Sequence, residues 1–77
     1  MKISSLGANV TEVTLNSGVK ILLSYDTPVA AFVPENDYFR TKCKFSNTTS
    51  SHINKWLDGK TAAPLEQSWF NSLYANA

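Results

Sequence analysis

The hydrophobic pattern of this chain changes its period near residue 46, and that change constrains the fold more than any other feature. Before it, apolar side chains alternate with polar ones, as in β-strands, whose side chains repeat every two residues. After it, apolar side chains recur every three or four residues, as on one face of a helix. The 77 residues suffice for one modest core. We therefore expect a single α+β domain over residues 1–77, with a small antiparallel meander of about four strands followed by two C-terminal helices.

The strand half begins with a hairpin over residues 10–25. Gly18 lies between its two strands and can take the positive φ of a short hairpin loop. Leu22 interrupts the alternation of the second strand, so we expect that strand to be central and covered on both faces. Asp26–Pro28 is expected to break this strand before another begins at 29–33, because proline lacks the amide proton that a ladder needs.

The last strand, predicted over residues 38–45, has a basic face. Alternation places apolar or small side chains on one face and cations on the other, namely Phe39, Thr41, Cys43 and Phe45 opposite Arg40, Lys42 and Lys44. Residues 38–60 hold five cationic side chains against one carboxylate, although the net charge of the chain is only +1. The sequence therefore offers this region to an anionic partner. The alternative, a solvated strand face or lysines that protect an edge strand, stays open.

The first helix is predicted within residues 48–59, "TTSSHINKWLDG". Its apolar stripe is formed by Ile53, Trp56 and Leu57, which we expect to be buried. A hydroxyl of Thr48, Thr49 or Ser50 is expected to cap its start, and Gly59 is expected to end it in the left-handed conformation.

The second helix is predicted to carry Pro64 in its first turn, where the missing N–H has no helical partner. Its apolar positions cover about half of the circumference and comprise Leu65, Trp69, Phe70, Leu73 and Tyr74. Such a wide face covers the sheet, a partner or both. We therefore expect a homodimer to which this C-terminal helix contributes one or two aromatic side chains.

The sequence contains no recognisable catalytic or metal-binding set. One histidine and one cysteine are too few ligands for a Cys/His zinc site, and the three glycines form no phosphate-binding loop. A nucleophilic pair of Cys43 and His52 is weighed against the commoner role of cysteine on an apolar face, a small buried hydrophobe. We expect no enzyme, no metal and no cofactor. His52 is expected to pack near Trp56, to form a surface hydrogen bond or to contact a partner.

The single cysteine permits no internal disulfide, which fits a reducing cytoplasm. The longest purely apolar run, "VAAFV", is too short to span a membrane. The expected location is therefore the cytoplasm, with no membrane partner.

Two stretches of the chain, "LLSYDTPVAAFVP" and "YFRTKCKFSNTTSSHINKWL", resemble a family of small proteins from bacteriophages and bacterial mobile elements. That family shares the pattern S-Y-x-T-P-V-A-A, then an aromatic-x-[RK]-T segment, then T-T-S-x-H-I-x-x-[WY]-L. The matching positions lie within about residues 10–58 and are Ser24, Tyr25, Thr27–Ala31, Arg40–Thr41, Thr48–Ser50, His52, Ile53, Trp56 and Leu57. The resemblance implies a phage context and a bacterial host cell, with no assigned activity.

These observations favour a small phage-type accessory protein that binds a host or phage macromolecule. An inhibitor of a host defence complex, of the anti-CRISPR kind, is one example, with a protein or nucleoprotein partner. The alternatives are a nucleic-acid-binding protein that uses the basic strand face, and a virion structural or assembly protein. The predicted partner surface consists of Arg40, Lys42, Lys44, His52 and Lys55.

Overall fold

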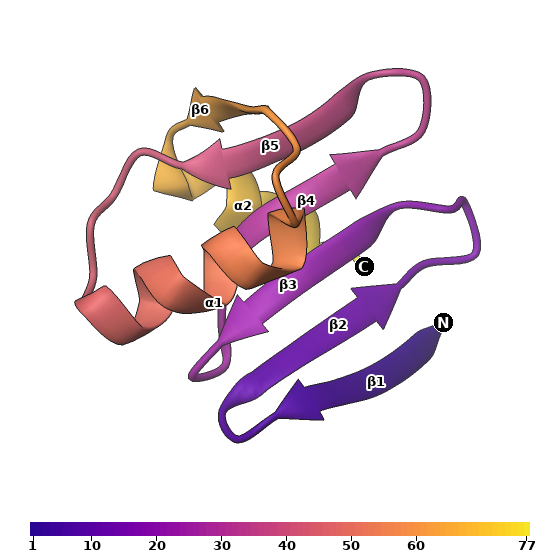
Figure 1. Ribbon diagram of the computed structural model, residues 1–77. Coiled ribbons are helices and arrows are strands. Elements are labelled where there is room, and N and C mark those ends of the chain that lie inside the picture. Colours follow the sequence, from indigo (N-terminus) through magenta and orange to yellow (C-terminus); the bar gives the residue numbers. More distant parts are fainter.

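Six strands form one sheet, and their order in the sheet follows their order in the chain (Figure 1). The structure is a computed structural model that describes residues 1–77. Its elements are β1 (Lys2–Gly7), β2 (Val10–Thr14), β3 (Lys20–Ser24), β4 (Thr27–Val33), β5 (Asp37–Thr41), α1 (Asn47–Leu57), β6 (Ala62–Leu65) and α2 (Gln67–Ala75). Neighbouring strands are antiparallel except β5 and β6, which are parallel. The α+β class is confirmed. The expected number of about four strands is wrong, because two further strands extend the sheet at its edges.

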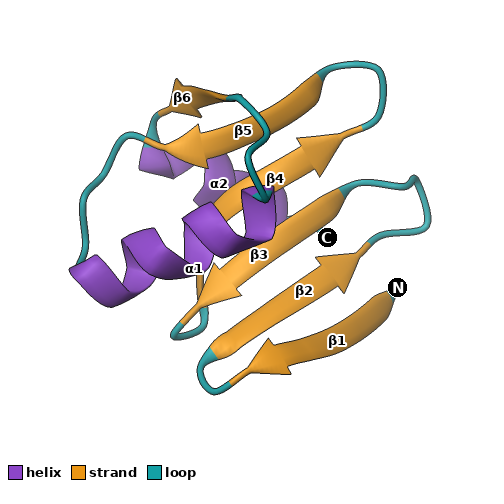
Figure 2. Cartoon of the chain, in the orientation of Figure 1, coloured by secondary structure: helices purple, strands orange, loops and turns teal.

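The two helices cover opposite faces of the sheet, with α1 in front and α2 behind in Figure 2. Strand β3 lies between them, and Ile21, Leu22 and Leu23 are 0%, 0% and 5% exposed. Leu22 belongs to the cluster that contains Ile53 of α1. Ile21 and Leu23 belong to a second cluster, against which Leu73 of α2 packs. The prediction of a central strand covered on both faces is therefore confirmed.

The predicted hairpin over residues 10–25 is confirmed by the pairing of β2 with β3, in which Val10 lies opposite Ser24. Gly18 has a φ of 94°, a conformation that side chains strongly disfavour. A Cβ atom at this position would lie 3.1 Å from Cγ of Pro34. The turn therefore needs glycine for its backbone conformation and for the close approach of a neighbouring loop.

The connection from β3 to β4 is tighter than the sequence suggested. Ser24 pairs with Thr27, so the loop contains only Tyr25 and Asp26, whose φ angles are 50° and 64°. Two positive φ angles in a two-residue loop describe a type I′ hairpin turn. Pro28 lies inside β4, at an irregularity in the β3–β4 pairing. The predicted break between the two strands is confirmed, although only Tyr25 and Asp26 form it. The expectation that Pro28 lies outside the strands is wrong, because such irregularities accommodate a residue without an N–H donor.

The two edge strands are the elements that the sequence did not predict as strands. In β1, five of the six residues are exposed, so no alternation of buried and exposed side chains marks it in the sequence. In β6, Pro64 lies opposite Arg40 of β5 instead of in the first turn of a helix. The predicted start of the second helix is wrong, because an edge strand has one open side and tolerates a proline there.

The N-cap of α1 lies two residues before the first residue predicted to cap it. The hydroxyl of Ser46 accepts a hydrogen bond from the backbone N–H of Thr49 at 3.1 Å, which makes Ser46 the N-cap in place of Thr48, Thr49 or Ser50. Asp58 ends the helix with a φ of 50°, and Gly59 follows at 82°. The left-handed conformation expected of Gly59 is confirmed, although Asp58 is the first residue to adopt it.

Most of the apolar face of helix α2 packs against other parts of the same chain. Phe70 is 0% exposed. Trp69 packs its ring against Phe39 of β5 at a centroid distance of 5.4 Å and against Phe70 at 4.9 Å. Tyr74 is the most exposed large apolar side chain of the helix, at 40%. The wide apolar face that motivated a homodimer through this helix is therefore explained mainly by the chain's own sheet.

Candidate functional site

The predicted row of cations does not lie on one strand face. Strand β5 ends at Thr41, whose hydroxyl accepts a hydrogen bond from the backbone N–H of Cys43 at 3.0 Å. Such a side-chain turn gives the backbone an alternative to the strand ladder and ends it. Lys42 and Lys44 follow the strand instead of belonging to it. The alternation predicted to residue 45 is wrong beyond Thr41, and Cys43 is exposed instead of buried.

The loop nevertheless brings the three cations of this row together. They line one open cavity of about 490 Å³ between the end of β5, the loop that follows it and the first turns of α1. We call it the basic cavity, and its wall consists of Arg40, Thr41, Lys42, Cys43, Lys44, Phe45, Thr49, Ser50, Ile53 and Pro64. Cations, hydroxyls and an aromatic ring on one concave surface can together bind an anionic group and an adjoining apolar group.

The cations of the basic cavity are largely free to meet a ligand. Nζ of Lys42 lies 3.3 Å from a carboxylate oxygen of Glu66, and the two side chains are 54% and 73% exposed. An ion pair this exposed contributes little to stability, so an anion can displace it at small cost. Arg40 and Lys44 form no ion pair within the chain. The cavity therefore carries an excess of positive charge.

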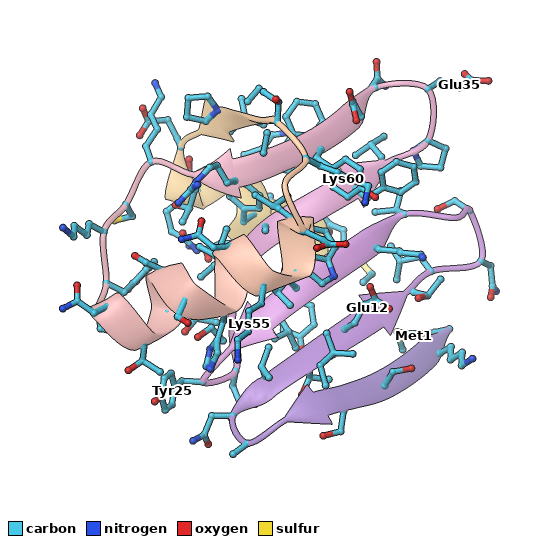
Figure 3. All side chains as sticks on the ribbon, in the orientation of Figure 1. Met1, Glu12, Tyr25, Glu35, Lys55 and Lys60 are labelled. Carbon is cyan, nitrogen blue, oxygen red and sulfur yellow. The ribbon has the colours of Figure 1, made fainter.

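His52 and Lys55 lie elsewhere, on the flank of α1 nearest β2, where Figure 3 shows Lys55. They line a smaller cavity of about 170 Å³ together with Leu6, Val10 and Trp56. The structure thus divides the five predicted partner residues into a set of three and a set of two. A partner that contacts all five must extend across α1.

His52 is held by a buried hydroxyl. Its Nδ1 lies 2.8 Å from Oγ of Ser24 in β3, and that oxygen also lies 3.1 Å from Oγ1 of Thr49. The ring of His52 faces Tyr25 at a centroid distance of 5.9 Å. Ser24 is 2% exposed, so this serine–histidine pair offers no accessible nucleophile. The contacts instead fasten α1 to β3. Sequence reasoning gave Ser24 no role, although Ser24 matches the family pattern and lies on the same face of the strand as Leu22.

Trp56 also has a partner that the sequence did not indicate. Its indole Nε1 donates a hydrogen bond to a carboxylate oxygen of Glu12 in β2 at 2.8 Å, and its ring meets Tyr38 edge to face at 5.6 Å. Trp56 is half-buried, which corrects the expectation that it is buried. The polar edge of the indole needs an acceptor, and Glu12 in the middle of β2 supplies one.

Cys43 and His52 line different cavities, so the nucleophilic pair weighed from the sequence is not assembled. The structure has no group of three or more histidine, cysteine, aspartate or glutamate side chains placed to hold a metal ion. Neither helix has the length and the apolar composition needed to cross a membrane.

Comparison with the curated proteins and comparison with the solved structures each find no significant match. One family model, described as a family of unknown function (DUF8033), matches residues 1–72. Because that match covers nearly all of the 77 residues, the chain belongs to the DUF8033 family.

Proposed function

We propose that this chain is a small phage-type accessory protein that acts by binding an anionic surface of a host or phage macromolecule in the bacterial cytoplasm. The observation that carries the proposal is the basic cavity, where Arg40, Lys42 and Lys44 converge on one concave surface. Because the net charge of the whole chain is only +1, the positive charge of the basic cavity is a local feature of the surface. Local charge of one sign steers and orients a partner of the opposite sign.

The way the cavity is built also supports a binding role. Lys42, Cys43, Lys44 and Phe45 lie in the connection between β5 and α1, and all four are exposed. The buried residues belong to the strands and helices around it. Binding residues are often carried by loops that a rigid scaffold holds in place. Inhibition of a host defence complex is one form that this binding can take, and the resemblance of the chain to phage proteins supports that setting.

Affinity capture from phage-infected cells tests the proposal. A tagged wild-type chain is compared with a variant that carries Arg40→Gln and Lys44→Gln, and with a control that carries Lys2→Gln and Lys20→Gln. The two variants lose the same charge, but Lys2 and Lys20 lie outside the basic cavity. We expect the wild type and the control to recover the same macromolecule, and the cavity variant to lose it. Equal recovery by all three chains contradicts the proposal.

His52 separates structural from binding effects in the same experiment. Because His52 lies outside the basic cavity and fastens α1 to β3, the substitution His52→Ala is expected to lower stability while capture of the partner persists. Loss of capture in a folded His52→Ala variant would extend the binding surface across α1 to the smaller cavity.

A further inference from the structure

We propose that the basic cavity binds single-stranded nucleic acid, with a phosphate between Arg40 and Lys44 and a base against Phe45. This inference rests on the proposed function, because it names the class of partner for the same surface. Of the anionic partners that three cations can attract, it specifies single-stranded nucleic acid.

The aromatic ring in the cavity is the observation that points beyond charge alone. Phe45 is 48% exposed and lines the basic cavity. The other three phenylalanines, Phe32, Phe39 and Phe70, each pack against another aromatic ring of the chain, and Phe45 does not. An unpaired ring beside cations is the arrangement with which proteins stack unpaired bases while binding the backbone.

The polar groups around this ring suit a phosphate. Arg40 offers a planar fork of donors and Lys44 a mobile ammonium, and neither is neutralised by a carboxylate of the chain. Ser50 lines the same wall, and its hydroxyl forms no hydrogen bond within the protein, so it is available to donate to a phosphate oxygen. The hydroxyl of Thr49 is already engaged with Ser24 and Ser46.

The exposed ring of Phe45 favours a single strand over a duplex. A cavity of about 490 Å³ is large enough to take a small organic group, since ligand pockets span about 300–1,000 Å³. The faces of duplex bases are stacked on one another, and only an unpaired base can turn its face to Phe45. An acidic protein surface, by contrast, has no need of an exposed aromatic ring in the cavity.

Fluorescence anisotropy tests the inference with labelled oligo-dT and oligo-U of about 12 nucleotides, a length within the usual site sizes, and with a duplex of the same length. Phe45→Ala is compared with Tyr74→Ala, which removes an exposed ring outside the cavity. We expect Phe45→Ala to weaken binding by about 5- to 150-fold at an unchanged salt slope. Phe45→Trp should retain binding, and Tyr74→Ala should leave it unaltered.

The variant that lacks the charges of Arg40 and Lys44 tests whether these side chains bind a phosphate. Replacing Arg40 and Lys44 by glutamine should reduce the slope of log affinity against log salt by about 0.7, since the two side chains share one phosphate and each single-strand phosphate that is neutralised contributes about 0.7. The Lys2→Gln, Lys20→Gln control should keep the wild-type slope.

Absence of binding to every oligonucleotide at low salt overturns the inference, as does equal binding of duplex and single strand. Equal effects of Phe45→Ala and Tyr74→Ala in folded proteins overturn the role of Phe45. If no oligonucleotide binds but capture of a protein from infected cells still depends on Arg40 and Lys44, the proposed function stands and this inference fails.

Discussion

The contact of His52 with Ser24 allows the strength of the link between α1 and the sheet to be measured. Ser24→Ala removes two hydroxyl contacts, one to His52 at 2.8 Å and one to Thr49 at 3.1 Å. Neither partner is left as a buried orphan, because Thr49 keeps its contact with Ser46 and His52 is half-exposed to water. At about 0.5–1.5 kcal/mol per hydrogen bond, the substitution should lower the free energy of unfolding by about 1–3 kcal/mol.

The size of this loss is large for so small a chain. At about 0.05–0.15 kcal/mol per residue, a chain of 77 residues has an unfolding free energy of about 4–12 kcal/mol. His52→Ala should cost about 1–2 kcal/mol, because it removes one hydrogen bond and the ring contact with Tyr25. Since both substitutions remove the same hydrogen bond, the double variant should be less destabilised than the sum of the two, by about 0.5–1.5 kcal/mol.

Urea unfolding followed by tryptophan fluorescence measures all members of this cycle. Ser51→Ala, an exposed position on the same helix with no side-chain hydrogen bond, provides the control and should change stability by less than about 0.5 kcal/mol. A coupling energy below about 0.3 kcal/mol, within the error of additivity, would refute the reasoning that the Ser24–His52 contact fastens α1 to β3.

Three further substitutions probe other parts of the fold. Phe70→Ala should lower the free energy of unfolding by about 3–5 kcal/mol in urea titrations, because it empties a fully buried site, and a loss below about 1 kcal/mol would contradict that burial. Glu12→Ala should cost about 1–2 kcal/mol and shift the fluorescence of Trp56, whose indole N–H loses its acceptor; an unchanged spectrum argues against the bond. Gly18→Ala should lower the thermal midpoint by several degrees, because a Cβ atom there combines a φ of 94° with a 3.1 Å approach to Pro34, and an unchanged midpoint would count against a strained turn.

Sequence periodicity was most informative where burial is strongest. The hairpin over residues 10–25 and the central position of β3 follow from alternation and from the extra apolar residue Leu22, and the structure confirms both. Strand β1 was not predicted, because it lies at an edge of the sheet where its side chains are exposed and show no alternation of apolar and polar residues. Strand β6 was not predicted either, because Pro64 fits an edge strand as well as a helix start.

The candidate site was predicted by composition better than by geometry. The concentration of charge around Arg40, Lys42 and Lys44 was visible in the sequence, and the structure gathers these residues into one cavity. The cause differs from the predicted one, because the strand ends at Thr41 and a loop carries the two lysines. The contact between His52 and Ser24 joins positions 28 residues apart, and local sequence patterns cannot predict such long-range contacts.

The parallel pairing of β5 with β6 has a consequence for how this family can diversify. Together with α1 it makes a small β-α-β unit at one edge of the sheet, and the basic cavity lies where the chain leaves the carboxyl end of β5 to enter the helix. In open α/β sheets, ligands bind outside the carboxyl ends of strands. Because residues 42–45 of this connection are all exposed, relatives can exchange them and acquire new ligands while Ser46 still caps α1 and the core is left undisturbed.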